Sequence, residues 1–304
     1  MKFAAVDVGT NSTRLLIVEY ENGNYQVVER DLVITRLGEG VDKNNLLKKE
    51  AIKRTVKALE KYDKKINNYQ VKNTKVVGTS ALRDVKNKKD FTRSLQKNTK
   101  LNLQVISGNE EAQYIYRGVK TDLCNKDFLI IDIGGGSTEF IWKKENEVIE
   151  KSLDIGAVRL TERVINNSKK PLSEKEYNIL KKEINNTLVN KNIDKFKTKK
   201  LIGVGGTITT LAAMNLKLKM YSSEKIHKHV LTKDKADKIF GKLAKRNFYK
   251  RKEIAGLNEK RADIITAGAA ILKFIMEIIN IGEIQISERD ILFGLINEAI
   301  EESE

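Results

Sequence analysis

Two stretches decide the fold of this chain: DVGTNST at residues 7–13 and DIGGGST at residues 132–138. Each closes a short apolar run, at 3–6 in the first copy and at 128–131 in the second. The copies correspond position by position, with an aspartate opening both and Ser-Thr closing both. Such a repeat predicts two α/β domains of similar architecture, each with an acid and a small-residue turn after a buried strand. We expect the two turns to face each other across a cleft.

The turns have the chemistry of a phosphate site. Glycine has no Cβ, so a glycine-rich turn exposes backbone N–H groups that a phosphate can approach closely. The carboxylates of Asp7 and Asp132 are oxygen ligands suited to Mg²⁺, which also takes phosphate oxygens and water. Hydroxyl donors for the phosphate are expected at Ser12, Thr13, Ser137 and Thr138. A third glycine-rich turn, at 203–207, argues against the alternative of ordinary strand-to-hairpin turns capped by Asp.

Apolar spacing predicts the same order of elements in both halves. In the first half we expect strands at 3–6, 15–20, 25–30, 75–78 and 103–106, and helices at 48–67, 91–96 and 110–119. In the second half we expect strands at 128–131, 139–142, 147–151, 201–204 and 284–286, and helices after Ser173, after Thr207, and at 233–245, 262–279 and 290–301. The expected domains are 1–124 and 125–304, with the boundary near 122–126. We expect the last helix, about 290–304, to pack back onto the first domain.

Composition limits the class of partner. The 304 residues include 57 Lys and Arg against 41 Asp and Glu, which gives a net charge of +16. Such an excess favours polyanions such as polyphosphate, acidic lipid or nucleic acid, and the alternative is a solvated surface rich in Lys and Asn. No aromatic–basic interleaving resembles an RNA-binding module, so we expect no specific nucleic acid.

Location is predicted from the same overview of the sequence. No apolar run approaches the roughly 20 residues that span a bilayer. The first residues, 1–3, lead directly into a strand rather than into a signal peptide. Cys124 is the single cysteine and cannot form an internal disulfide. We therefore expect a cytoplasmic protein without a membrane partner.

Two further positions carry potential chemistry. Glu110 and Glu111 stand in the first turn of an expected helix, where acids interact favourably with the helix dipole. One of them could instead serve as a general base, and spacing alone does not separate these roles. Arg83 follows a short buried strand, and it either holds a phosphate in bidentate fashion or pairs with Asp84.

A pair of histidines is a weaker candidate. His227 and His229 are two residues apart, so on a strand they would share a face. No cysteine or acid cluster nearby completes a zinc set, and we do not expect a metal there.

Together these motifs resemble those of the exopolyphosphatase and guanosine pentaphosphate phosphohydrolase (Ppx/GppA) family. The matching stretches are DVGTNS at 7–12, GTSALR at 78–83, ISGNEEA at 106–112 and IDIGGGSTE at 131–139. The resemblance implies two ribonuclease-H-like domains of the actin-like ATPase fold with the active site in a central cleft. It also implies Mg²⁺-dependent release of the terminal phosphate from polyphosphate or guanosine pentaphosphate (pppGpp), and it allows for a homodimer.

The resemblance further implies roles for individual residues. Glu111 matches the catalytic glutamate that activates the attacking water, and Arg83 matches a phosphate contact. Asp132 matches the metal-binding acid with Glu139 near the metal, and Asp7 stays a further candidate ligand. The implied phosphate cradle consists of Gly134, Gly135, Gly136, Ser137 and Thr138. Further ligand contacts are expected from Asn11, Ser12 and Thr13 in the first turn and from Gly205, Gly206 and Thr207 in the third.

Two other functions fit the same motifs. A sugar or acyl kinase or ATPase of this superfamily would phosphorylate an added small molecule with ATP, and residues 203–207 would then hold adenosine. A non-catalytic sensor would bind ppGpp tightly and release no phosphate. An actin-like filament is disfavoured, because a net charge of +16 opposes self-association.

Overall fold

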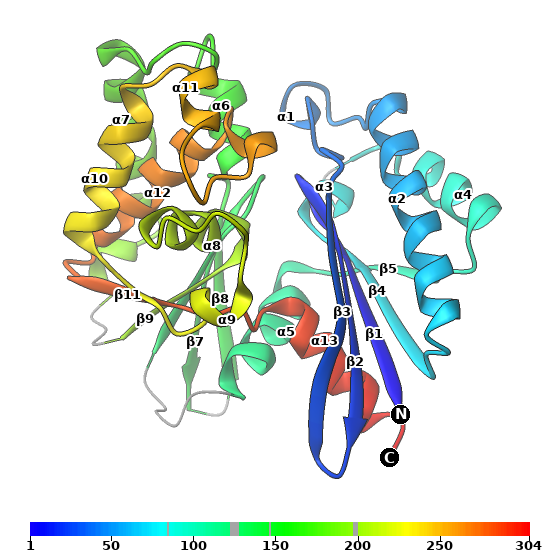
Figure 1. Cartoon of the computed structure of the whole chain (residues 1–304). Helices are drawn as coiled ribbons and strands as arrows, with labels where there is room; N and C mark the ends of the chain where they lie inside the picture. The colour runs from blue at the N-terminus through cyan, green and yellow to red at the C-terminus, as the bar shows by residue number, and fades with distance from the viewer. Residues whose placement is uncertain (84, 122–127, 146, 197–199) are drawn as a thin grey trace. The chain divides into compact units, whose positions relative to one another are not determined.

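Each copy of the repeat connects the first two strands of one β-sheet (Figure 1). The computed structural model describes the 304 residues except 84, 122–127, 146 and 197–199. It contains unit 1, Met1–Leu123 with Arg289–Glu304, and unit 2, Cys124–Glu288. The boundary expected near 122–126 and the residue Cys124 lie outside the described residues.

The sheet of unit 1 has the strand order β3-β2-β1-β4-β5. Its strands are β1 (Lys2–Val8), β2 (Ser12–Glu21), β3 (Asn24–Ile34), β4 (Asn73–Gly78) and β5 (Leu103–Val105). Strand β1 pairs antiparallel with β2 and parallel with β4. Asn22 and Gly23 join β2 to β3 with positive φ angles, as a two-residue hairpin turn requires.

The sheet of unit 2 repeats this topology. Its order is β10-β11-β9-β6-β7-β8. The strands are β6 (Leu129–Ile133), β7 (Thr138–Lys144), β8 (Glu147–Leu153), β9 (Leu201–Val204), β10 (Val230–Thr232) and β11 (Glu283–Ile286). Strands β6, β7, β8, β9 and β11 correspond in order to β1 through β5, so the predicted α/β fold with a repeated topology is confirmed. Strand β10, antiparallel to β11, was not predicted from the sequence.

Helices lie against both faces of the unit 1 sheet. They are α1 (Val41–Asn44), α2 (Lys49–Asn68), α3 (Ser80–Arg83), α4 (Lys88–Asn98), α5 (Gly108–Lys120) and α13 (Ile291–Glu301). Ala4, Val6 and Val8 of β1 share a buried cluster with residues of α2. Helix α13 contacts β1, β2, β4 and α5. Because successive strand residues point to opposite faces, Asp7 points away from the α2 cluster.

Helices α5 and α13 meet at their backbones. A Cβ at Gly118 would overlap the carbonyl oxygen of Asp290, and one at Gly294 would overlap that of Tyr114. Glycine at these two positions therefore permits a close helix crossing. The crossing fixes the start of α13, where the Asp290 side chain accepts a hydrogen bond from the Leu292 N–H at 3.1 Å.

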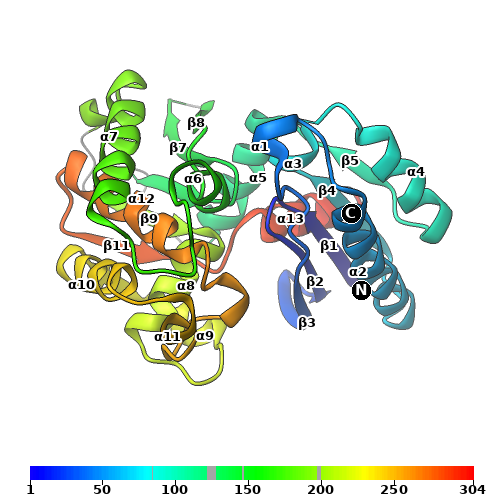
Figure 2. The same cartoon turned by 90° about the horizontal axis from the view of Figure 1, so that it is seen from above.

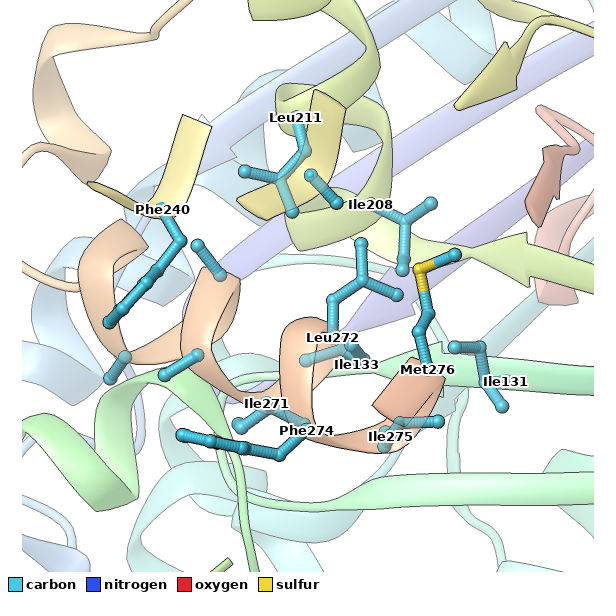
Figure 3. Packing of buried hydrophobic residues seen from close by; sticks show 14 of the residues in the cluster. Ile131, Ile133, Ile208, Leu211, Phe240, Ile271, Leu272, Phe274, Ile275 and Met276 are labelled. Atoms are coloured by element: carbon cyan, nitrogen blue, oxygen red, sulfur yellow. The ribbon is translucent and has the colours of Figure 1, made fainter. Parts of the chain in front are cut away.

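The core of unit 2 surrounds helix α12. The helices are α6 (Ala157–Val164), α7 (Glu174–Asn190), α8 (Gly205–Asn215), α9 (Ser223–Ile226), α10 (Lys233–Ala244), α11 (Phe248–Lys252) and α12 (Ile265–Ile278). Helix α12 lies between α7 and α10 (Figure 2). Its side chains pack with Ile131 and Ile133 of β6 and with Ile208 of α8 (Figure 3). The helix that the sequence predicts after Ser173 is confirmed as α7, and a capping box of Ser173 and Glu176 begins it.

None of the helices that the structure describes is both long enough and apolar enough to cross a lipid bilayer.

A buried arginine joins three segments of unit 2. The Arg251 side chain is 2% exposed, and its guanidinium donates to the carbonyl oxygens of Leu243 (3.0 Å), Ser168 (2.9 Å) and Lys170 (3.0 Å). Burial lowers the pKa of Arg251, and the charge of Asp263 acts in the opposite direction. The arginine therefore supplies charged donors to the carbonyls of Ser168 and Lys170 and a second donor to that of Leu243, which also accepts from the Arg246 N–H at 3.3 Å.

Replacing Arg251 with methionine should lower the free energy of unfolding by about 3–5 kcal/mol, because several carbonyls lose charged donors together. The exposed neighbour Lys250 is a matched control, and Lys250→Gln should change stability by less than about 0.5 kcal/mol. Urea denaturation of both variants measures the difference. Equal stability of the two variants would contradict the role given to Arg251.

Candidate active site

Among the described residues, the glycine loop of unit 2 has two carbonyl groups that accept hydrogen bonds and three amides that donate none. The N–H of Ala157 donates to the Gly134 carbonyl at 3.0 Å, and the N–H groups of Val158 and Arg159 donate to that of Gly135 at 2.9 and 3.1 Å. These donors belong to the first turn of α6. In the part of the chain that the structure describes, the N–H groups of Gly135, Gly136 and Ser137 have no acceptor. The loop therefore presents donors suited to an anion.

Gly156 holds this arrangement in place. It precedes α6, and a Cβ there would overlap the carbonyl group of Gly135. The hydroxyl of Thr138 donates to the Ile155 carbonyl at 2.5 Å, so the segment before α6 is also tied to β7. The Thr138 hydroxyl is thus used within the fold, and the donors of the cradle are mainly backbone amides.

Two acids, Asp132 and Glu139, lie side by side on the strands that flank the glycine loop. Asp132 and Glu139 are direct partners across β6 and β7, so their side chains share one face of the sheet. Glu139 is 2% exposed, and its Oε1 accepts a hydrogen bond from the Ser152 hydroxyl at 3.0 Å. Two neighbouring carboxylates repel each other, and a bound cation would relieve this repulsion.

The donor set of this acid pair fits Mg²⁺. Both groups offer carboxylate oxygens, which are the ligands that Mg²⁺ prefers. Among the described residues, no cluster of three or more His, Cys, Asp or Glu side chains has the geometry of a metal site. A magnesium ion at Asp132 and Glu139 would therefore take its remaining ligands from water and phosphate, as is usual for this ion.

The third glycine turn, at residues 203–207, lies against the Asp132 carboxylate. Gly205 has a φ angle of 84°, and a Cβ at this residue would overlap Oδ1 of Asp132. The turn therefore brings the start of α8 to the Asp132 carboxylate. Val204, the N-cap residue of α8, provides no side-chain cap. The Thr207 side chain instead packs toward Gly268 of α12, which leaves mainly the backbone of this turn for a ligand.

Arg261 is a residue that sequence reasoning did not select. Its buried guanidinium lies over Gly206, where a Cβ would overlap it. The arginine thus adds a positive charge beside the start of α8. Its position immediately before the apolar segment 262–279 could have indicated a role. A charged side chain that is buried beside such a segment needs an anionic or polar partner.

The first loop, in unit 1, has the same backbone pattern. Gly9 donates to the Ser12 carbonyl at 3.0 Å, just as Gly134 donates to that of Ser137. The Asn11 side chain is 6% exposed, and neither its amide oxygen nor its nitrogen has a partner among the described residues. Unpaired buried polar atoms cost about 1–3 kcal/mol each, so this amide is suited to a ligand. The Thr13 hydroxyl is used internally, 3.1 Å from that of Thr35.

Asp7 differs from its counterpart Asp132. Its Oδ2 accepts hydrogen bonds from Nε (2.9 Å) and Nη2 (2.6 Å) of Arg14, which also pairs with Asp290. Burial raises the pKa of Asp7, and the Arg14 guanidinium acts in the opposite direction. Only Oδ1 is buried without a partner among the described residues. Asp7 therefore already has a positive partner, and only one of its oxygens suits a metal.

Helix α5 separates the roles of the two adjacent glutamates. Glu110 forms the capping box with Ser107, whose N–H donates to its carboxylate at 2.7 Å. The pKa of Glu110 is lowered mainly by the hydrogen bond from the Ser107 backbone N–H and further by that from the Ser107 hydroxyl. Glu111 is 9% exposed, and its Oε2 accepts a hydrogen bond from Nη1 of Arg83 at 2.6 Å. The capping role thus belongs to Glu110, and Glu111 is oriented by an arginine.

Asp84 and the two histidines complete the set of positions that the sequence singles out. Asp84, the other proposed partner of Arg83, lies outside the described residues. The two histidines both have partners within unit 2. Nδ1 of His227 accepts from the Glu288 N–H at 3.2 Å, and Nε2 of His229 lies 2.9 Å from the Asn215 amide nitrogen.

Two units of this topology, each with an Asp-Gly-Ser/Thr loop between its first two strands, define a duplicated α/β fold with one such loop in each unit. The chain belongs to the Ppx/GppA phosphatase family, whose sequence model matches residues 16–302.

Individual relatives agree with this assignment. The bifunctional 3-dehydroquinate synthase/phosphatase of Fusobacterium nucleatum is 39% identical over 98% of this chain, which spans 46% of that protein. Exopolyphosphatase 2 of Mycobacterium tuberculosis is 32% identical over 97% of both chains. Among solved structures, an exopolyphosphatase from Cytophaga hutchinsonii has a TM-score of 0.91 at 27% identity, covering 99% of this chain and 98% of that one.

Proposed function

We propose that this chain hydrolyses phosphoanhydride bonds and releases orthophosphate from the end of inorganic polyphosphate or pppGpp. The observation that carries the proposal is the glycine loop, where open amides lie beside the paired acids Asp132 and Glu139. Phosphoryl transfer depends mainly on positioning and charge neutralisation, which this arrangement can supply. The names of the Mycobacterium and Cytophaga relatives support the same substrate class.

Mg²⁺ is the cofactor that fits the acid pair. Asp132 and Glu139 would hold the ion, and bound there it would neutralise charge on the phosphate. Asp7 is less suited to this role, because Arg14 already pairs with it. The amides of Gly135, Gly136 and Ser137 would orient the phosphate, and Arg261 would add positive charge beside the third turn.

Glu111 is the group suited to accept a proton from the attacking water. A general base must be correctly oriented, and the hydrogen bond from Arg83 orients the Glu111 carboxylate. Arg83 would also help to neutralise a phosphate, as the resemblance implies. Glu111 belongs to unit 1 and Asp132 to unit 2. Their joint action in one reaction stays a prediction of the resemblance.

Phosphate release measured in parallel with tripolyphosphate, long-chain polyphosphate, pppGpp and ATP tests the proposal. With Mg²⁺ we expect release from polyphosphate or pppGpp, and excess EDTA should abolish it because the acid pair would then repel the anionic substrate. Mg²⁺ should also raise the melting temperature of the wild-type protein but not that of Asp132→Ala.

Three outcomes would contradict the proposal. No release from any of the four substrates would exclude the hydrolase. Phosphorylation of an added small molecule by ATP, without polyphosphate hydrolysis, would favour the kinase. Tight ppGpp binding without release would favour the sensor.

A further inference from the structure

Two strongly basic segments of unit 2 lie together. Residues 166–170 and 242–252 contain eight lysines and arginines and no acid. Phe248 donates to the Lys169 carbonyl at 2.9 Å, and Arg251 donates to those of Ser168 and Lys170. The buried Arg251 therefore holds the two segments side by side, so basic residues of both segments lie on neighbouring parts of the surface.

This surface lacks internal neutralisation. We call it the α11 basic surface; it consists of Lys169, Lys170, Lys245, Arg246 and Lys250, which are exposed or half-exposed. Within the described ranges, none of these five side chains forms an ion pair, whereas the adjacent Lys252 pairs with Glu259 at 2.7 Å. Clustered like charges oppose each other, so the surface is suited to a polyanion.

Other lysine-rich parts of the chain are arranged differently. Helix α2 carries exposed Lys53, Lys57, Lys61 and Lys64, but Glu50, Glu60 and Asp63 alternate with them. On α10, Lys238 pairs with Asp234 at 2.7 Å. A general excess of lysine therefore does not account for the acid-free grouping around α11.

The α11 basic surface is connected to the glycine loop through α6. The amides at the start of α6 hold the loop, and the chain beyond its end leads to Lys169 and Lys170. Helix α6 has eight residues and is about 12 Å long. Arg251 also donates to the Ala262 carbonyl at 3.4 Å, next to Arg261. An extended polyanion can thus contact the loop and the surface at the same time.

We propose that the α11 basic surface binds the distal part of a polyphosphate chain whose end lies in the glycine loop of unit 2. The proposal rests on the proposed function and assigns a chain-length preference to it. A polyphosphate presents a regular row of negative charges and needs no aromatic contact. Single-stranded nucleic acid is less suited, because such sites stack successive bases on aromatic rings. Here Tyr249 is 66% exposed, but the neighbouring Phe248 ring is covered by the Lys252 ammonium group.

The test compares the triple variant Lys245→Gln, Arg246→Gln and Lys250→Gln with the wild type. The ratio of KM for long-chain polyphosphate to KM for tripolyphosphate should rise about tenfold, because only the long chain reaches the surface. Added salt should raise this ratio in the wild type more than in the variant. The control variant, Lys53→Gln with Lys57→Gln and Lys64→Gln, makes the same charge change on α2 and should leave the ratio unaltered.

Direct binding separates this proposal from the proposed function. Long-chain polyphosphate is titrated into each protein without turnover, in EDTA, with single-stranded DNA as the second probe. Weaker polyphosphate binding by the α11 variant alone supports the surface, even if the wild type releases no phosphate. If the α11 variant had the wild-type KM ratio and bound long-chain polyphosphate as tightly as the wild type, the proposed role of the α11 basic surface would be overturned. If the α11 variant lost binding of single-stranded DNA but retained binding of polyphosphate, the assignment of polyphosphate to this surface would be overturned as well.

Discussion

Replacing Glu111 with glutamine is expected to lower the rate of phosphate release by about 10²- to 10⁴-fold, the usual contribution of a general base. Glutamine has nearly the same shape and still offers Arg83 an oxygen acceptor in place of the Glu111 carboxylate. It cannot take a proton from water, so kcat should fall while substrate binding persists. Steady-state phosphate release and a separate binding titration measure the two effects.

Glu110→Gln is the matched control for this experiment. Glutamine can still accept the Ser107 N–H in the capping box of α5, so Glu110→Gln loses only the charge near the helix N-terminus and should reduce stability by about 0.3–1 kcal/mol without a comparable loss of kcat. Substantial turnover by Glu111→Gln would show that the base has been wrongly assigned. A larger kcat effect at Glu110 than at Glu111 would contradict the division of roles between the two glutamates.

Replacing Gly205 with alanine is expected to reduce phosphate release by at least about 100-fold. The added Cβ would overlap Oδ1 of Asp132, so the carboxylate must move, and a displacement of about 1 Å can cost 10²-fold in rate. The φ angle of 84° adds backbone strain of about 1–2 kcal/mol for a non-glycine residue. Kinetics and thermal unfolding report these two effects separately.

Gly241 provides the comparison for Gly205. It lies within α10, and a Cβ there would meet nothing within 4 Å. Gly241→Ala should leave activity unchanged and stabilise the fold by about 0.5–1 kcal/mol, because alanine favours the helix. If Gly205→Ala behaved in the same way, the Asp132 carboxylate would not be held as the structure indicates.

Much of the fold was predictable because its signals are local. The run before each loop, the hairpin turn at Asn22 and Gly23, and the capping box at Ser173 depend on residues close in sequence. Strand β10 was missed, since three residues at a sheet edge carry little periodicity and depend on β11 for pairing. The helix expected at 262–279 begins only at Ile265, because residues 259–261 form a 3₁₀ turn.

The candidate site was predictable in kind but not in detail. The motifs selected Asp132, Glu139 and Glu111 as candidates, and their catalytic and metal roles stay predictions. Spacing could not decide between Glu110 and Glu111, since both stand in the first turn of α5. The distinction depends on Arg83, which is 28 residues away from Glu111 in the sequence. The sequence gives no role to Arg261, because only the folded chain brings it to Gly206.

The amino-acid sequence by itself determined the repeat, the strand–loop–strand units and the residue types that can hold a phosphate and a metal. The sequence already made the two loops unequal, because Arg14 follows Ser-Thr in the first copy and Glu139 follows it in the second. Tertiary structure alone decided which partners surround the acid of each loop. Asp7 pairs with Arg14, which also reaches Asp290 at the far end of the chain, whereas Asp132 lies against Gly205 at the start of α8. The physical reason is that the charge and access of a carboxylate are set by neighbours in space, and these neighbours come from distant parts of the chain.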